Sequence, residues 1–145
     1  MTLSMPRTIV LDAEAVSALA RGQHGVAELL EAALRTRSRA VIPSVVLAEV
    51  MTGAPADAAI WRVANRIPVI PIDSALAATA GRLREQAESV RREKRDLTVD
   101  AIVAAVAASV APATVATSDI DDLTLLLAGS DVTTIHVHTP GAPTR

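Results

Sequence analysis

Short apolar runs alternate with longer segments of helical pattern along this chain. Runs of this length are too short for helices and are typical of strands. They lie at residues 8–11, 40–43, 68–72, 114–117 and 131–137. Helical patterns lie at residues 13–20, 26–34, 45–51, 56–65, 75–90, 97–110 and 123–127. Strands that alternate with helices predict an α/β fold, with a short parallel central sheet and helices on both of its faces.

One stretch combines the strongest of these patterns with charge. Residues 97–110 read as an alanine-rich, buried helix whose single charge, Asp100, stands just inside its start. The strand that follows opens into an acidic cluster at residues 119–122. Because α/β folds build binding sites at the ends of strands, we expect the functional site where this helix and strand meet Asp12, which follows the first strand.

Composition narrows the functions open to such a fold. Half of the residues are hydrophobic, but Trp61 is the single aromatic residue. Nucleic-acid binding by stacking of bases on aromatic side chains is therefore disfavoured, and any such contact must use arginine, metal or backbone. The absence of cysteine excludes disulfides and thiolate–metal sites. Trp61 itself is expected in the core or in a dimer interface.

Length and apolar runs bear on domain number and location. We expect one domain over residues 1–138, followed by a disordered tail at residues 139–145. The first residues lack the apolar core of a secretory signal. The most apolar run, residues 101–116, is shorter than the ~18 to 20 residues of a membrane-spanning helix. A cytoplasmic protein without membrane attachment is expected.

Four acids stand at the edges of apolar runs, where an unpaired charge is costly. They are Asp12, Glu49, Asp100 and Asp119. Asp12 and Asp119 follow strands that are expected side by side near the centre of the sheet. Glu49 and Asp100 are expected in early turns of helices, whose positive ends offset part of the cost of an anion. We predict that all four converge on one cleft.

A divalent cation is the natural partner for such a cluster, because the apolar runs contain no basic residue. Carboxylate oxygens suit Mg²⁺ or Mn²⁺, and one or two ions fit four carboxylates. Such a site supports phosphodiester hydrolysis by a nuclease or a phosphatase. Taken singly, Asp12 fits equally well as the N-cap of the first helix and Asp119 or Asp121 as that of the last, and Glu14 fits as a solvated helix residue. Glu49 and Asp100 lie inside the expected helices and resist the capping interpretation.

Four segments together resemble the motifs of PIN-domain ribonucleases, in particular the VapC-type toxins of bacterial toxin–antitoxin pairs. They are Val10-Leu11-Asp12, Leu47-Ala48-Glu49-Val50, the segment from Asp100 to Ala107, and Thr117-Ser118-Asp119-Ile120-Asp121-Asp122-Leu123. The resemblance spans residues 9–137 and implies a PIN-like three-layer fold. It also implies that Asp12, Glu49, Asp100 and Asp119 are catalytic metal ligands. Thr117 would orient the cluster, and Asp122 would be a further acid.

The same resemblance implies a set of partners. It points to an Mg²⁺- or Mn²⁺-dependent endonuclease that cleaves RNA, forms a homodimer and is inhibited by an antitoxin whose carboxyl-terminal segment covers the site. The sequence departs from the family pattern at Leu123, where an aromatic residue often stands. Crowding of Asp119, Asp121 and Asp122 leaves open which of them faces the metal, with Asp119 favoured because it follows the strand end.

A basic stretch precedes the central helix. Arg91, Arg92 and Arg95 are candidate contacts to RNA phosphates, with a solvated helix face as the alternative and residues 35–39 as a rival basic patch. Two other functions stay open: a non-catalytic PIN-fold binding module, and a phospho-aspartate phosphatase or receiver. The phosphatase or receiver is disfavoured because proteins of that class usually have a lysine after a later strand. The single lysine here, Lys94, is expected in a loop.

Overall fold

The five apolar runs form one parallel sheet in the computed structural model, which describes residues 6–90 and 95–137. The strand order is β3-β2-β1-β4-β5, so the first strand is central and the proline-flanked third strand is at an edge. The strands are β1 Thr8–Leu11, β2 Arg39–Pro43, β3 Val69–Ile70, β4 Ala113–Thr117 and β5 Val132–His136. The predicted parallel sheet is confirmed.

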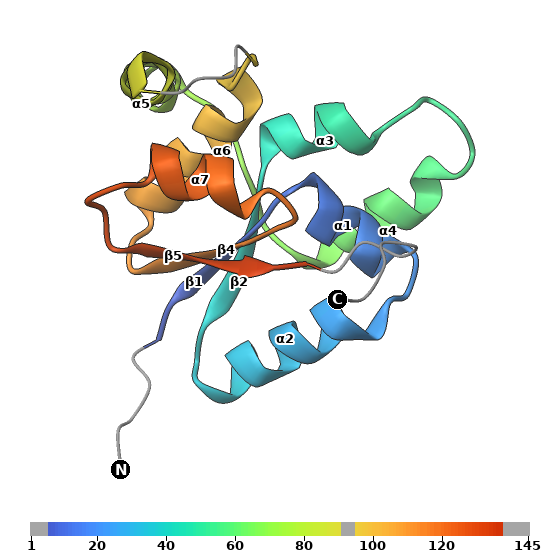
Figure 1. Cartoon of the computed structure of the whole chain (residues 1–145). Helices are drawn as coiled ribbons and strands as arrows, with labels where there is room; N and C mark the ends of the chain where they lie inside the picture. The colour runs from blue at the N-terminus through green and yellow to red at the C-terminus, as the bar shows by residue number, and fades with distance from the viewer. Residues whose placement is uncertain (1–5, 91–94, 138–145) are drawn as a thin grey trace, which may run out of the picture.

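Helices cover both faces of this sheet and complete the three layers (Figure 1). Those of the described residues are α1 Ala13–Ala20, α2 His24–Arg35, α3 Ser44–Val50, α4 Asp57–Arg66, α5 Ser74–Val90, α6 Thr98–Ser109 and α7 Ile120–Leu126. Helix α1 packs with α2 and α4 on one face, and α6 packs with α5 and α7 on the other. Within the described residues, no helix has both the length and the apolar character needed to cross a membrane.

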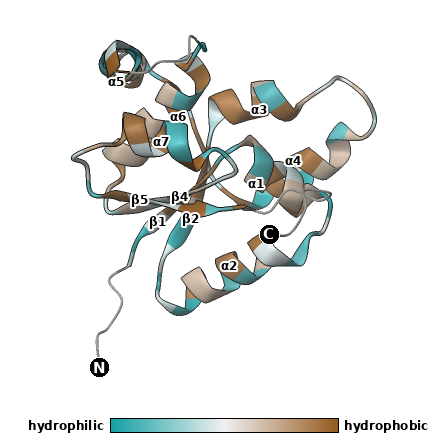
Figure 2. Ribbon diagram, viewed as in Figure 1, coloured by the Kyte–Doolittle hydropathy of each residue, from teal (hydrophilic) through white to brown (hydrophobic). Residues whose placement is uncertain are grey.

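Side-chain size explains how α6 is placed. Its buried residues are alanine and valine, and Ala104 and Ala107 have no exposed surface. Because alanine is the smallest side chain that still favours a helix, α6 lies close enough to contact β1, β2 and β4 at once. By contrast, Figure 2 shows hydrophobic and hydrophilic bands alternating along α2, as expected for a helix with one face in solvent.

One expectation about the core is wrong. Trp61 is 52% exposed, whereas its neighbour Ile60 is buried. Helix α4 is amphipathic and turns Ile60 toward the core, so the next residue is rotated by about 100° away from it. The alternative location of Trp61, a dimer interface, stays a prediction.

The polypeptide reverses its direction of travel across the sheet between β1 and β4. From β1 the chain moves outward to β2 and β3, then returns to β4 on the other side of β1. The pairing of Leu11 with Ala116 brings Asp12 beside Thr117, and the Asp12 N–H donates to the Ala116 carbonyl at 3.2 Å. Crevices at the carboxyl ends of strands at such a switch point are where open α/β sheets bind ligands.

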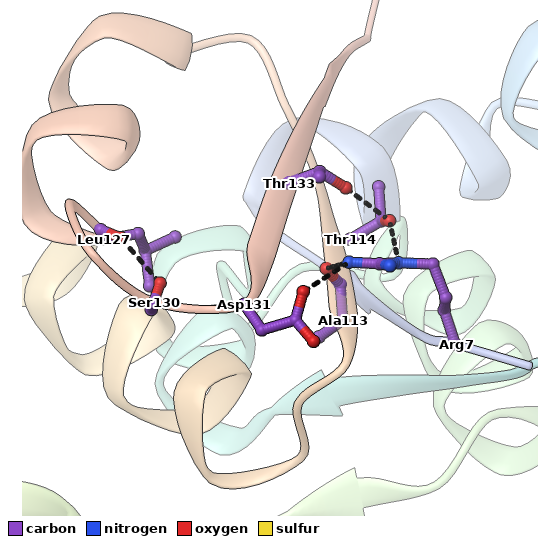
Figure 3. Close-up of polar contacts among 7 residues, drawn as sticks. All are labelled: Arg7, Ala113, Thr114, Leu127, Ser130, Asp131 and Thr133. Carbon is purple, nitrogen blue, oxygen red and sulfur yellow. Dashed lines mark hydrogen bonds and ion pairs between the residues drawn. The ribbon is translucent and has the colours of Figure 1, made fainter. Parts of the chain in front are cut away.

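A polar network ties the strands together at the opposite, amino-terminal edge of the sheet (Figure 3). Arg7 Nη2 donates to the Ala113 carbonyl at 3.0 Å and lies 3.8 Å from Asp131 Oδ1. Arg7 Nε donates to Thr114 Oγ1 at 3.3 Å, and this hydroxyl lies 2.8 Å from Thr133 Oγ1. One guanidinium thereby links the starts of β1, β4 and β5.

We expect Arg7→Ala to lower the free energy of unfolding by about 1 to 2 kcal/mol, because two side-chain hydrogen bonds are lost. Urea denaturation followed by circular dichroism measures this. Asp131→Ala is the matched control and is expected to cost about 0.5 kcal/mol or less, because the exposed Asp131 side chain contributes only a weak ion pair. Equal costs for the two variants would show that the ion pair, and not the hydrogen bonds, holds this edge.

Candidate metal centre

Three acids from three segments meet at the carboxyl edge of the sheet. Asp100 lies in the first turn of α6, Asp119 in the loop after β4, and Asp122 in the first turn of α7. One carboxylate oxygen from each lies within 4.8 Å of the others. The donors are all carboxylate oxygens, and this donor chemistry fits a hard divalent cation such as Mg²⁺ or Mn²⁺.

The start of α7 determines which acids take part. The sequence pattern places this helix at residues 123–127, but it begins at Ile120. The earlier start turns Asp122 inward, where it is 5% exposed, and leaves Asp121 in solvent. Asp119 occupies the N-cap position, yet among the described residues its side chain makes no capping hydrogen bond. The N-cap interpretation of Asp119 is therefore wrong, and its carboxylate faces the cluster.

Thr117 connects this cluster to Asp12. Its side chain is fully buried at the end of β4, and its Oγ1 accepts a hydrogen bond from the Asp119 N–H at 2.9 Å. Asp12 Oδ1 accepts from the Ala15 N–H at 3.1 Å, so Asp12 does cap α1. Burial raises the pKa of Asp12, although hydrogen bonds from Thr117 and Ala15 lower it in part. Asp12 thus both caps α1 and lies next to the acidic cluster.

Glu49 lies apart from the three clustered acids. Glu49 lies in the last turn of α3, not in an early turn. The prediction that the positive end of the helix stabilises its charge is therefore wrong. The helix ends at Val50 because Asp57 accepts hydrogen bonds from the Thr52 and Gly53 N–H groups and closes a turn there. Partial burial, then the negative charges of Asp12 and Glu14, raises the pKa of Glu49.

The predicted convergence of four acids therefore holds in part. Asp100 and Asp119 gather with Asp122, whereas Glu49 lies within electrostatic reach of Asp12. Thr117 links the two groups. Its hydroxyl accepts a hydrogen bond from the backbone N–H of Asp119 and forms another with the carboxylate of Asp12. Glu14 is half-buried beside the second group, which the solvated interpretation did not anticipate.

A basic residue reaches the cluster from outside the apolar runs. Arg95 Nη2 lies 3.4 Å from Asp119 Oδ2, and Arg95 Nη1 lies 3.6 Å from Asp122 Oδ2. Sequence reasoning gave Arg95 as a candidate phosphate contact or as part of a solvated helix face, and it missed these ion pairs. Arg91, Arg92 and Lys94 lie outside the described residues.

The start of α6 is fixed by a second polar group that sequence reasoning also missed. Asp96 Oδ1 accepts hydrogen bonds from Thr98 N at 3.0 Å and Thr98 Oγ1 at 2.6 Å. Arg84 Nη1 donates to Thr98 Oγ1 at 3.0 Å from the neighbouring helix α5. An Asp two residues before a Thr is a local turn signal that could have revealed the Asp96–Thr98 contact. No such local signal predicts the contact of Arg84 with Thr98.

Burial and the neighbouring acids both disfavour the charged form of Asp100. Burial, followed by the charge of Asp119, a hydrogen bond with Asp119 and the charge of Asp122, raises the pKa of Asp100 to about 7. The positive charge of Arg95 acts in the opposite direction. A folded-state pKa above the ordinary value of 3.8 means that Asp100 ionises at a cost to stability. Its contribution to stability is present below pH 3.8 and is lost as pH rises through about 7.

We therefore expect Asp100→Asn to stabilise the metal-free protein at pH 8 by about 1 to 3 kcal/mol, because each unit of pKa shift corresponds to ~1.4 kcal/mol. At about pH 3 the variant and the parent should differ little, since Asp100 is then largely protonated in both the folded and the unfolded protein. Urea denaturation with EDTA at both pH values measures this. Asp121→Asn makes the same charge change at an exposed neighbour and should show no such pH dependence. A loss of stability at both pH values would instead assign Asp100 a structural role.

Solved structures share this fold. A chain in the crystal structure of VapBC2 from Rickettsia felis bound to promoter DNA matches with a TM-score of 0.72 at 17% identity, covering 90% of this chain and 99% of that chain. Salmonella typhimurium VapBC bound to DNA gives a TM-score of 0.65 at 18% identity, with 88% and 98% covered. FitAB bound to a DNA fragment gives 0.62 at 22% identity, with 88% and 94% covered. At these identities the likeness establishes the fold.

Sequence comparison assigns the family. No curated protein sequence matches this chain significantly. The family model of the PIN domain matches residues 9–124, which include β1 through most of α7 and all four of the predicted acids. Because this match covers most of the chain, the protein belongs to the PIN-domain family.

Proposed function

We propose that the protein is a metal-dependent endoribonuclease, the VapC-type toxin of a toxin–antitoxin pair. The observation that carries this proposal is the meeting of three carboxylates within 4.8 Å at the carboxyl ends of β1 and β4. Family membership supports a nuclease, and the strand switch point is where this class of sheet binds ligands. The low aromatic content of the chain disfavours binding of nucleic acid by stacking on aromatic side chains.

The residues divide into those that hold a cation and those that position them. Asp100, Asp119 and Asp122 would hold Mg²⁺ or Mn²⁺, with Asp12 and Glu49 as the further acids of the site. A bound cation supplies an activated water and stabilises the charge that develops on the phosphate. Thr117 fixes the Asp119 backbone and the Asp12 carboxylate, so its buried hydroxyl sets the spacing between the two groups of acids.

RNA is the proposed substrate, and arginine is the proposed means of binding it. Arg95 is 61% exposed at the rim of the acidic cluster, where a substrate phosphate must approach. Arg91 and Arg92 precede it by a few residues and complete the proposed basic surface. Charge-assisted contacts of this kind hold the backbone without reading its sequence.

Partners are proposed from the relatives. The structures that share the fold are chains of the VapBC2, VapBC and FitAB assemblies bound to DNA. By analogy, a cognate antitoxin binds this protein and covers the acidic site, and two copies form a dimer in the cytoplasm. The exposed Trp61 on α4 is a candidate for burial in such an interface. The receiver-like alternative is set aside because the chain belongs to the PIN-domain family.

The nuclease is tested by incubating purified, antitoxin-free protein with total RNA in Mg²⁺, Mn²⁺ or EDTA. We expect fragments with either metal and none with EDTA. Asp100→Asn and Asp12→Asn should lower the cleavage rate on the order of 100-fold or more, because each removes charge that positions the reacting groups. Asp121→Asn is the matched control and should cleave at the parental rate.

Two results would contradict this proposal. Cleavage that persists in EDTA would argue against a metal-dependent reaction. A folded, metal-binding protein that cleaves no RNA from its own host would favour the non-catalytic PIN-fold module.

The basic surface is tested separately, in an Asp100→Asn background that prevents cleavage. Arg91→Ala together with Arg92→Ala should weaken RNA binding and reduce the slope of log affinity against log salt by about 1.4, at ~0.7 per phosphate contact for single strands. Fluorescence anisotropy with a labelled RNA measures both quantities. Arg35→Ala with Arg37→Ala removes the same charge from the rival patch and should leave the slope unchanged. The opposite result for the two pairs would move the RNA surface to residues 35–39.

A further inference from the structure

The guanidinium of Arg95 lies across two members of the acidic cluster. Its two terminal nitrogens take separate partners, Asp119 Oδ2 at 3.4 Å and Asp122 Oδ2 at 3.6 Å. These are two of the three carboxylates whose oxygens lie within 4.8 Å of one another. The chain therefore brings a positive charge of its own to the carboxylates proposed to bind the metal.

The backbone beside Arg95 is fixed, whereas its side chain is free to turn. The next residue, Asp96, is held by two hydrogen bonds to Thr98 at the start of α6, and Arg84 holds Thr98 from α5. The Arg95 side chain is nevertheless 61% exposed. It can leave the carboxylates by rotation about its own bonds, and no packed element has to move.

A guanidinium that pairs with Asp119 and Asp122 opposes a divalent cation at the same two carboxylates. A hard cation requires close oxygen ligands at about 2.0 to 2.1 Å for Mg²⁺. Like charges near the ion would also repel, since a guanidinium stays protonated at all working pH values. Arg95 at Asp119 and Asp122 therefore opposes binding of the cation, and its withdrawal removes that repulsion.

We propose that Arg95 is a built-in counter-ion that competes with the metal for Asp119 and Asp122 and thereby lowers the affinity of the site for its cation. This inference rests on the metal site of the proposed function. In the metal-free protein Arg95 relieves the repulsion between the acids, and on metal binding its guanidinium is released at the rim where RNA is proposed to bind. One residue thus links the two binding events.

The test measures Mn²⁺ binding without RNA, by the loss of the electron paramagnetic resonance signal of free Mn²⁺. Arg95→Ala should bind Mn²⁺ roughly 3- to 10-fold more tightly than the parent, because the two ion pairs of Arg95 no longer oppose binding. Arg82→Ala removes one positive charge from an exposed position on α5 and is the control for a general change in potential. Its Mn²⁺ affinity should stay within about twofold of the parent, as expected for screened surface charges.

A second readout uses the metal-free protein in EDTA. Arg95→Ala should melt at a lower temperature than the parent, because the acids then repel without a counter-ion, and Mn²⁺ should raise its melting temperature by more than it raises the parent's. In the Asp100→Asn background, Arg95→Ala should also weaken RNA binding. Tighter metal binding and weaker RNA binding in one variant are opposite changes that a merely structural role would not produce.

The outcomes separate this inference from the proposed function. Equal Mn²⁺ affinity in Arg95→Ala and the parent overturns the competition and leaves the metal site standing. Weaker Mn²⁺ affinity in Arg95→Ala also overturns it and would make Arg95 a support of the site. Absence of Mn²⁺ binding in both proteins overturns the metal site and the competition together.

Discussion

The cost of gathering carboxylates in a partly buried crevice governs the rest of this structure. One carboxylate oxygen each from Asp100, Asp119 and Asp122 lies within 4.8 Å of the others, and burial together with these neighbouring acids raises the pKa of Asp100 to about 7. Each neighbour offsets part of that cost. The helix start at Asp100 and the Arg95 guanidinium both place positive charge against the acids. The part of the cost that these positive charges do not offset favours binding of a cation.

The fold tolerates this electrostatic cost because its stability comes from interactions away from the acidic cluster. The amino-terminal edge of the sheet is tied by Arg7, and the centre is packed by α6 against three strands. Neither depends on the charge state of the site, which lies at the other end of the strands. Such a division is common in α/β proteins, whose ligand crevice lies at the carboxyl edge while the core lies between the layers.

Local pattern predicted most of the fold, and its failures have physical reasons. The strands around Val10 and Val115 and the alanine-rich helix follow from short-range periodicity, so their positions were predictable. The start of α7 was not, because residues 120–122, with two adjacent acids, look like a loop until the helix is supported by burial of Leu123 and Leu126. That one boundary decided between Asp121 and Asp122. Arg95 was missed as a cluster partner because its contacts reach residues 24 and 27 positions away in the sequence.

Helix α6 has one more consequence, which concerns the dimensions of the crevice. The row Ala101, Ala104 and Ala105 of this helix is buried, and such small side chains let the helix lie close to the strands it contacts. Asp100 is attached to this helix, whereas Asp119 follows the strand it packs against. Any larger side chain in that row would push the helix outward and carry Asp100 away from Asp119. The small size of the alanine side chains therefore sets the distance between Asp100 and Asp119.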